Sequence, residues 1–183
     1  MKGAPGSGRP FCHDLAGPLS GRSHSETGAV MAKFSAVSLA RLEGAHPLLQ
    51  KVMNAAIEKF NFMILQSQRD RADQEKALRK GNTHAHFGQS AHNWAPAIAL
   101  DVAPYPLDWN DRQRFIALSK VVGCFNPATG FGYGIAKELM VPLRWGGDWN
   151  FNGILTDEHL SDLPHYELHP WREWAKHSRL FGA

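Results

Sequence analysis

Apolar side chains at helical spacing, an amphipathic pattern and residues typical of helix ends together predict helices in four stretches of the chain. These stretches cover residues 46–60, 71–80, 111–122 and 171–179. The first is the clearest, because its apolar positions form one continuous face and Pro47 suits a first helical turn.

Residues typical of helix ends flank two of these stretches. Asp70 can cap the second helix, and Gly81 can end it. Asn110 or Asp108 can cap the third helix, and Gly123 follows it as a stop.

Short apolar runs between the helical stretches predict strands at residues 62–65, 98–103 and 166–169. Pro104 and Pro106 close the second strand, and the glycine-rich residues 130–134 predict a turn. Helices and strands are mixed without a regular βαβ alternation, which favours a single compact domain of the α+β class.

Residues 1–30 differ from the rest, because they are rich in Gly, Ser, Pro and Arg and show no helical or strand period. Such a segment buries too little apolar surface to offset its ordering entropy. We expect a flexible leader or an upstream extension here, and one folded domain over residues 31–183.

The net charge, the lengths of the apolar runs and the cysteine spacing exclude several classes of partner and site. A net charge of +3 in 183 residues is too small for a dedicated nucleic-acid binder, although it suits a polyanionic envelope. No apolar run approaches the ~20 residues of a membrane span, and residues 1–30 lack the apolar core of a secretory signal. Cys12 and Cys124 form no CxxC pair, so a structural zinc site of the Cys type is excluded.

Two polar groups in apolar surroundings suggest chemistry. His92 lies at the edge of a loop, and Asp101 lies inside the apolar run 98–103. A carboxylate in a buried strand is costly unless it is paired or binds a metal. Much later, Pro164 biases the chain to an extended conformation, with His165 near the start of a strand.

Two imidazoles and one carboxylate suit a catalytic zinc site, which leaves its fourth position to water. A carboxylate near that water can act as the general base, and Asp162 is suitably placed, three residues before His165.

These segments resemble motifs of the D-alanyl-D-alanine carboxypeptidase family of zinc peptidases, which includes phage L-alanyl-D-glutamate endopeptidases. Residues 90–101 resemble its SxHxxGxAxD motif, and residues 162–165 its later (E/D)xxH element. Residues 144–149 resemble the WGGDW segment of the endolysin branch, and residues 69–74 the upstream RxxxxQ stretch. The resemblance covers about residues 34–175, with the motifs in the family's order.

The resemblance implies a small antiparallel sheet flanked by helices, as in hedgehog domains and D-alanyl-D-alanine peptidases. It implies one Zn²⁺ ion held by His92, Asp101 and His165, with Asp162 as the base and Arg69 facing the developing oxyanion. It also implies residues that orient the ligands or line a substrate groove, namely Ser90, Gln74, Trp145, Asp148 and Glu167.

One departure concerns the first motif. His92 and Asp101 are nine positions apart rather than the family's seven, and Ala95-Pro96-Ala97 replaces the common glycine. We interpret this as a two-residue loop insertion before the strand.

Alternatives remain open at two positions. His169 competes with His165 as a ligand, because a strand places both on one face. Glu167 shares that face and is the alternative general base. His84 and His86 are expected to be solvent-facing loop residues, and the tryptophans to form core or groove wall.

The function implied by the resemblance is that of a phage-type endolysin that cleaves the L-Ala–D-Glu bond of the bacterial peptidoglycan stem peptide. A D-Ala-D-Ala carboxypeptidase is the alternative enzyme, and a non-catalytic zinc-binding module is the alternative of another class. We expect a monomer made in the host cytoplasm, without nucleic-acid binding or membrane insertion, that reaches the wall after a holin permeabilises the inner membrane.

Overall fold

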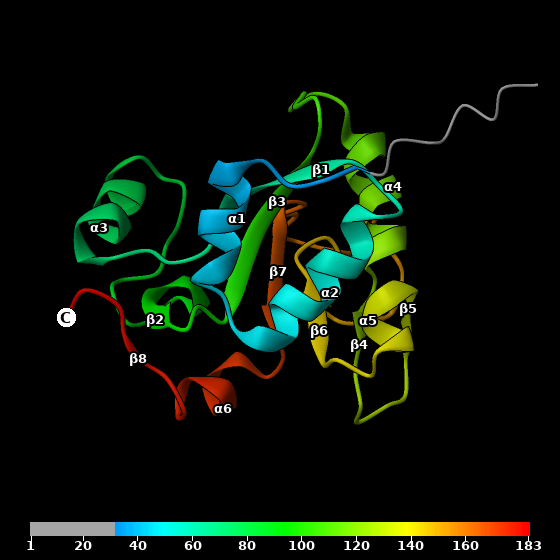
Figure 1. Cartoon of the computed structure of the whole chain (residues 1–183). Helices are drawn as coiled ribbons and strands as arrows, with labels where there is room; N and C mark the ends of the chain where they lie inside the picture. Colours follow the sequence, from blue (N-terminus) through cyan, green and yellow to red (C-terminus); the bar gives the residue numbers. More distant parts are fainter. Residues whose placement is uncertain (1–31) are drawn as a thin grey trace, which may run out of the picture. The chain divides into compact units, whose positions relative to one another are not determined.

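The computed structural model describes residues 32–183, and all the motifs named above fall within them (Figure 1). The segment 1–30, expected to be a leader, lies outside the described residues, as does Cys12.

Six α-helices and one 3-10 helix are present in this part of the chain. They are α1 (Ala36–Glu43), α2 (Pro47–Ile57), α3 (Arg71–Arg79), η1 (Ala91–Asn93), α4 (Arg112–Val122), α5 (Gly134–Glu138) and α6 (Trp171–Ala175). Helices α2, α3 and α4 match the periodic stretches, because each buries an apolar face or begins at a capping residue.

Two helix ends differ from expectation. The cap of α4 is Asp111, whose side chain accepts from the backbone N–H of Arg114 at 3.1 Å, and neither Asn110 nor Asp108 takes that role. The last helix ends at Ala175 rather than at Arg179, because Arg179 pairs with Ala95 as part of a strand.

The described strands are β1 (Phe62–Gln66), β2 (Trp94–Ala95), β3 (Ala99–Pro104), β4 (Cys124–Phe125), β5 (Gly132–Tyr133), β6 (Leu143–Trp145), β7 (His165–Leu168) and β8 (Arg179–Leu180). Six of them form one sheet in the order β1-β3-β7-β6-β4-β5, and every pairing is antiparallel. This is the expected α+β architecture, a small antiparallel sheet flanked by helices.

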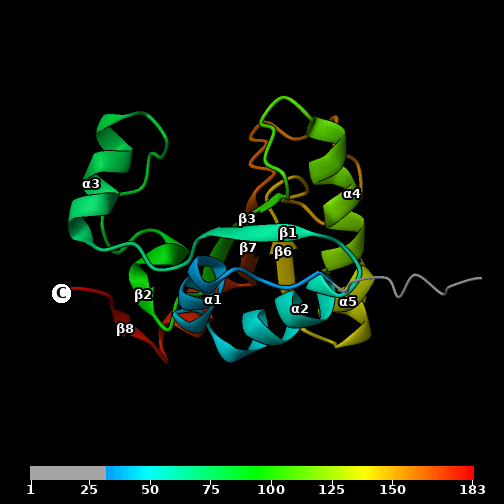
Figure 2. The same ribbon diagram turned by 45° about the horizontal axis from the view of Figure 1, so that its top comes forward.

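Side chains of β3 and β7 point alternately to the two faces of the sheet, one toward the hydrophobic core and the other toward the candidate site. Leu100 and Val102 of β3, with Tyr166 and Leu168 of β7, are fully buried in the hydrophobic core. The residues between them, including Asp101, point to the other face. Figure 2 shows α1 and α2 on one side of the strands, and α3 with the β3–α4 loop extending on the other.

The loop after His92, which we interpret as carrying a two-residue insertion, is held at both of its ends. Strand β2 forms there and pairs with β8 near the C-terminus. The backbone N–H of Ala97 donates to the carbonyl of Gly44, and the N–H of His46 donates to the carbonyl of Ala97, both at 2.8 Å. The longer loop is therefore anchored by backbone hydrogen bonds.

Among residues 32–183, no helix combines the length and the apolar character that a bilayer crossing requires.

Candidate metal centre and its cleft

The register of β3 and β7 brings two of the expected ligands together. Asp101 and His165 are direct partners in this antiparallel pair, so their side chains leave the sheet on the same face. His92 joins them from η1, whose N-cap Ser90 accepts from the backbone N–H of His92 at 3.3 Å.

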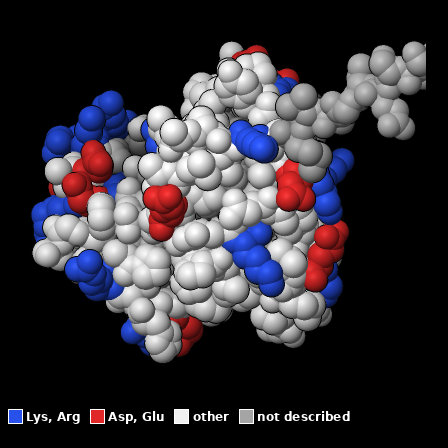
Figure 3. Space-filling model, viewed as in Figure 1, with Lys and Arg blue, Asp and Glu red and all other residues white. Residues whose placement is uncertain are grey.

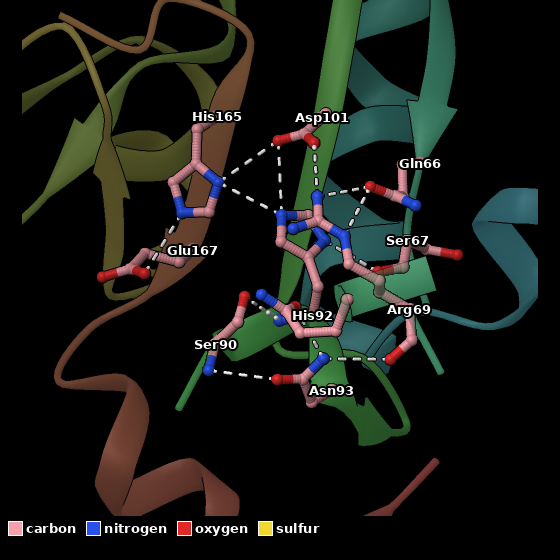
Figure 4. Close-up of polar contacts among 10 residues, drawn as sticks. Gln66, Ser67, Arg69, Ser90, His92, Asn93, Asp101, His165 and Glu167 are labelled. Carbon is pink, nitrogen blue, oxygen red and sulfur yellow. Dashed lines mark hydrogen bonds and ion pairs between the residues drawn. The ribbon is translucent and has the colours of Figure 1, made fainter. Parts of the chain in front are cut away.

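The three side chains converge on one point (Figure 4). Nε2 of His92 lies 3.3 Å from Oδ1 of Asp101 and 3.2 Å from Nδ1 of His165. Nδ1 of His165 lies 3.2 Å from the same carboxylate oxygen. Of the groups within residues 32–183, this is the set of His and acidic side chains arranged to hold a metal ion.

Hydrogen bonds on the outer sides of both rings determine which nitrogen faces inward. Nδ1 of His92 lies 2.7 Å from the carbonyl of Ser67, which only accepts, so Nδ1 carries the proton. Nε2 of His165 lies 3.1 Å from Oε2 of Glu167 and donates to it. With both rings neutral, as metal binding requires, their remaining lone pairs would point at each other and at Asp101, which is an arrangement suited to a cation.

The distances also fit zinc. Donor atoms about 2.0–2.1 Å from a tetrahedral ion lie about 3.3 Å from one another. The two nitrogens and the oxygen are 3.2–3.3 Å apart. A set of two imidazoles and one carboxylate matches the donor chemistry of catalytic zinc sites.

Mutual charge effects hold the metal-free cluster together. Burial alone would raise the pKa of Asp101, but His92 and His165 lower it well below its usual range. Burial alone would lower the pKa of His165, but Asp101 and Glu167 raise it to about 10. Without a metal, His165 is therefore an imidazolium held between two carboxylates.

Asp162 lies at the edge of the same cleft, in the loop that leads into β7. Asp162 is exposed, yet partial desolvation raises the pKa of its carboxyl. The charge of Asp101 also raises this pKa, whereas His165 lowers it. Gly146 fixes this loop, because its carbonyl accepts from the backbone N–H of Asp162 at 2.8 Å. A Cβ at Gly146 would lie 2.4 Å from the backbone oxygen of Asp162, so the close approach requires glycine.

Arg69 lies beside the cluster, in the segment leading to α3. Its guanidinium is 3.7 Å from Oδ2 of Asp101 and donates from Nε to Oε1 of Gln66 at 2.9 Å. Its backbone N–H donates to the carbonyl of His92 at 2.9 Å. Arg69 thus presents a positive charge to the cleft beside the candidate metal ligands.

A buried amide, which the sequence did not single out, connects these parts. Nδ2 of Asn93 donates to the carbonyl of Arg69 and to Oε1 of Gln74, both at 3.0 Å. Its Oδ1 accepts from the backbone N–H of Ser90 at 3.2 Å. Its neighbour Gln74 is also fully buried and lies outside the cleft lining, so it links α3 to the loop carrying His92.

A row of polar side chains continues across the sheet from His165. Arg144 of β6 is the register partner of Glu167, and its guanidinium donates to Oε1 of Glu167 from Nε at 3.0 Å. Burial raises the pKa of Glu167, but His165 and Arg144 outweigh it and lower the pKa. Trp149 lies across this row, with its ring stacked 5.5 Å from that of His165.

Trp145 and Asp148 lie behind the cleft and do not line it. Nε1 of Trp145 donates to the carbonyl of Leu163 at 2.7 Å, which positions the loop before His165. Asp148 is fully buried and accepts from the backbone N–H groups of Asn152 and Gly153, both at 3.0 Å. Both residues shape loops around the site without facing a substrate.

The other histidines lie outside the cluster. His169 is adjacent to Phe151, 5.2 Å between ring centroids, and burial lowers its pKa. His84 and His86 are exposed in the loop after α3, as expected.

The cluster opens into a cleft of about 930 Å³. Its walls include Arg69, Asp162, Trp149 and residues of α3. A metal centre beside an open cleft can act on a bound substrate.

Comparison with known proteins identifies relatives of this chain. Residues 30–169 match the family described as phage L-alanyl-D-glutamate peptidase. The chain is 34% identical over 131 residues to the L-alanyl-D-glutamate peptidase of Escherichia phage T5, covering 69% of this chain and 88% of the phage protein. It shares its fold with the Serratia marcescens L-Ala D-Glu endopeptidase ChiX, with a TM-score of 0.59, 23% identity and coverage of 81% and 98% of the two chains.

Proposed function

The chain belongs to the family of phage L-alanyl-D-glutamate peptidases, and on that premise we propose that it is a zinc-dependent endolysin that hydrolyses the L-Ala–D-Glu bond of peptidoglycan stem peptides. The observation that carries the zinc dependence is the convergence of three lone-pair atoms, from His92, Asp101 and His165, at the distances of a tetrahedral face.

A zinc ion bound there supplies Lewis-acid chemistry, because it polarises a carbonyl and lowers the pKa of water. Asp162 takes a proton from the attacking water and returns it to the leaving amine of D-Glu. Support for this role comes from its position in the cleft and its exposure, which leave the carboxylate free to meet a substrate.

Arg69 stabilises the oxyanion that forms on the L-Ala carbonyl. Its side chain is largely buried, and Gln66 and Asp101 hold it in place beside the cluster. A fixed cation requires little reorganisation when the negative charge develops, which is the source of its catalytic value.

Glu167 orients His165 and is not the base in this proposal. Its carboxylate is buried and engaged by both His165 and Arg144, so neither oxygen is free to accept a proton from water. Ser90 and Gln74 also orient a ligand, because they support the loop that carries His92. Ser90 accepts from the backbone N–H of His92, and Gln74 accepts from the side chain of Asn93.

The partner of the enzyme is the peptidoglycan stem peptide, on which it acts as a monomer. Made in the host cytoplasm, it reaches this substrate once a holin has opened the inner membrane.

Digestion of purified peptidoglycan tests the proposal. The zinc-loaded protein should generate new N-terminal D-Glu, identified by mass spectrometry, and chelation should abolish the product. Release of free D-Ala would identify a carboxypeptidase instead, and an absence of new termini would indicate a binding module.

A further inference from the structure

The two sides of the cleft differ in chemical character. On α3 and its C-cap, four residues at helical spacing line the cleft, namely Asp73, Lys76, Ala77 and Lys80. The lining also includes Trp109 of the β3–α4 loop and Leu160 of the loop between β6 and β7. Figure 2 shows α3 and the β3–α4 loop both rising above the strands, on the side away from α1 and α2, with α3 at the left and the loop at the right.

The α3 side carries two ammonium groups that are free to bind an anion. Lys76 and Lys80 are exposed, and within residues 32–183 neither has an ion-pair partner. Like charges at this i,i+4 spacing disfavour a helix by a few tenths of a kcal/mol. The helix dipole favours basic residues near the C-terminal end, but it does not explain why these two face the cleft while Arg79 does not.

Lys and Arg side chains gather over α3, with acidic groups among them, and charged groups also lie at the top of the molecule near the β3–α4 loop (Figure 3).

The other side presents an aromatic surface. Trp109 is 62% exposed, although one face of its ring is stacked on Phe115, with 5.9 Å between centroids and 17° between planes. Leu160, also on the lining, is 61% exposed. An indole fixed on one face and open on the other is a platform for the apolar C–H face of a sugar ring.

The proposed substrate has the same asymmetry about its scissile bond. The nitrogen of L-Ala is acylated by the lactyl group of muramic acid, so a neutral sugar lies roughly 7 Å, or two residue lengths, from the scissile carbonyl. On the other side, D-Glu carries a free α-carboxylate, and the peptide continues to a terminal carboxylate.

We propose that the cleft binds the stem peptide in a single direction, with the D-Glu side toward Lys76 and Lys80 and the muramic acid ring on Trp109. This assignment rests on the proposed function and adds to it the direction of binding. Complementary charge on one side and an aromatic surface on the other disfavour the reversed peptide, because it would place carboxylates on the indole and a sugar on the lysines.

The test uses the zinc-loaded full chain and three synthetic peptides. The reference is acetyl-L-Ala-γ-D-Glu-L-Lys, the second carries N-acetylmuramic acid in place of acetyl, and the third has both carboxylates converted to amides. The variants are Lys76→Gln with Lys80→Gln, and Trp109→Ala. Arg79→Gln and Tyr105→Ala are matched controls, because both residues are exposed neighbours outside the cleft lining.

The lysine double variant should lower kcat/KM for the acidic reference peptide about 3- to 10-fold, as expected for exposed ion pairs, and leave the diamide unchanged. Trp109→Ala should reduce the preference for the muramyl peptide over the reference about 3- to 10-fold. The control variants should behave as wild type.

Crossed effects, in which the lysines govern the muramyl preference and Trp109 the carboxylate preference, would overturn the proposed direction. Unchanged preferences in both variants would overturn it as well. Calorimetric binding of the same peptides, in an Asp162→Asn background, gives these ratios without cleavage. If the wild type cuts none of the peptides, the proposed function fails, whereas the binding ratios still decide the direction.

Discussion

His165 and Glu167, two positions apart on β7, are joined by a hydrogen bond of 3.1 Å between Nε2 and Oε2. The bond leaves Nδ1 of His165 directed at Asp101 and His92. Arg144 holds the other oxygen of Glu167, so the orientation of the imidazole depends on a neighbour in β6. The geometry of the candidate metal centre therefore depends on residues outside it.

Substitution at Glu167 should lower the zinc affinity more than the catalytic rate of the zinc-loaded protein. Glu167→Ala should reduce zinc affinity about 10- to 100-fold, as for other residues that orient a ligand, whereas Glu167→Gln keeps an acceptor for Nε2–H and should lose less. Competition with a chelator measures the affinity. A Glu167→Ala protein with normal zinc affinity and a collapsed rate would make Glu167 the base.

Removal of a ligand should abolish both zinc retention and lysis. His92→Ala, Asp101→Ala and His165→Ala should each lower the zinc content and remove the zinc-induced rise in melting temperature. His84→Ala is the control, because His84 lines the cleft but lies outside the cluster. Stoichiometric zinc in the His165→Ala protein would point to His169 as the ligand.

Asp162→Asn should separate catalysis from metal binding. The variant keeps the size of the side chain and should retain zinc and fold, but lose about 10²–10⁴-fold in rate, the usual contribution of general acid–base catalysis. Turnover of a defined stem peptide, with zinc counted in the same samples, is the measurement. Near-normal turnover would remove Asp162 from the mechanism.

Zinc binding should release a proton from His165. Burial lowers the pKa of this imidazole, but Asp101 and Glu167 raise it to about 10, so the metal-free ring is charged at neutral pH. Because the pKa of His165 is higher in the folded protein than in the unfolded chain, its protonation stabilises the metal-free protein. This stabilisation is fully present below about pH 6.5 and is lost as the pH rises through about 10. Between about pH 7 and 9, zinc affinity should therefore rise roughly tenfold per pH unit. Calorimetry in buffers of different ionisation enthalpy should show one proton released, and a pH-independent affinity would contradict this.

Deletion of residues 1–30 should leave activity and melting temperature nearly unchanged. The segment has no core-forming pattern, and the hydrophobic core of residues 32–183 is continuous across helices and sheet. Thermal unfolding of the two forms is the measurement. A fall of many degrees would show that the segment docks on the domain.

The sequence alone was sufficient where a local pattern carries the information. Periodic apolar faces and capping residues predicted α2, α3 and α4, because helix contacts lie within four residues along the chain. The position of Asp101 inside an apolar run and the order of the motifs predicted the set of His92, Asp101 and His165 that the fold brings together.

Tertiary structure decided what depends on distant pairing. The two-residue strands β2, β4, β5 and β8 have no readable period, and they exist because a partner strand satisfies their backbone groups. The register that sets Asp101 opposite His165 joins residues 64 positions apart, and no local pattern encodes it. The same holds for the Arg144–Glu167 pair, for Asn93 beneath Arg69, and for the placement of Trp145 and Asp148 behind the cleft, because each follows from which strands and loops pack together.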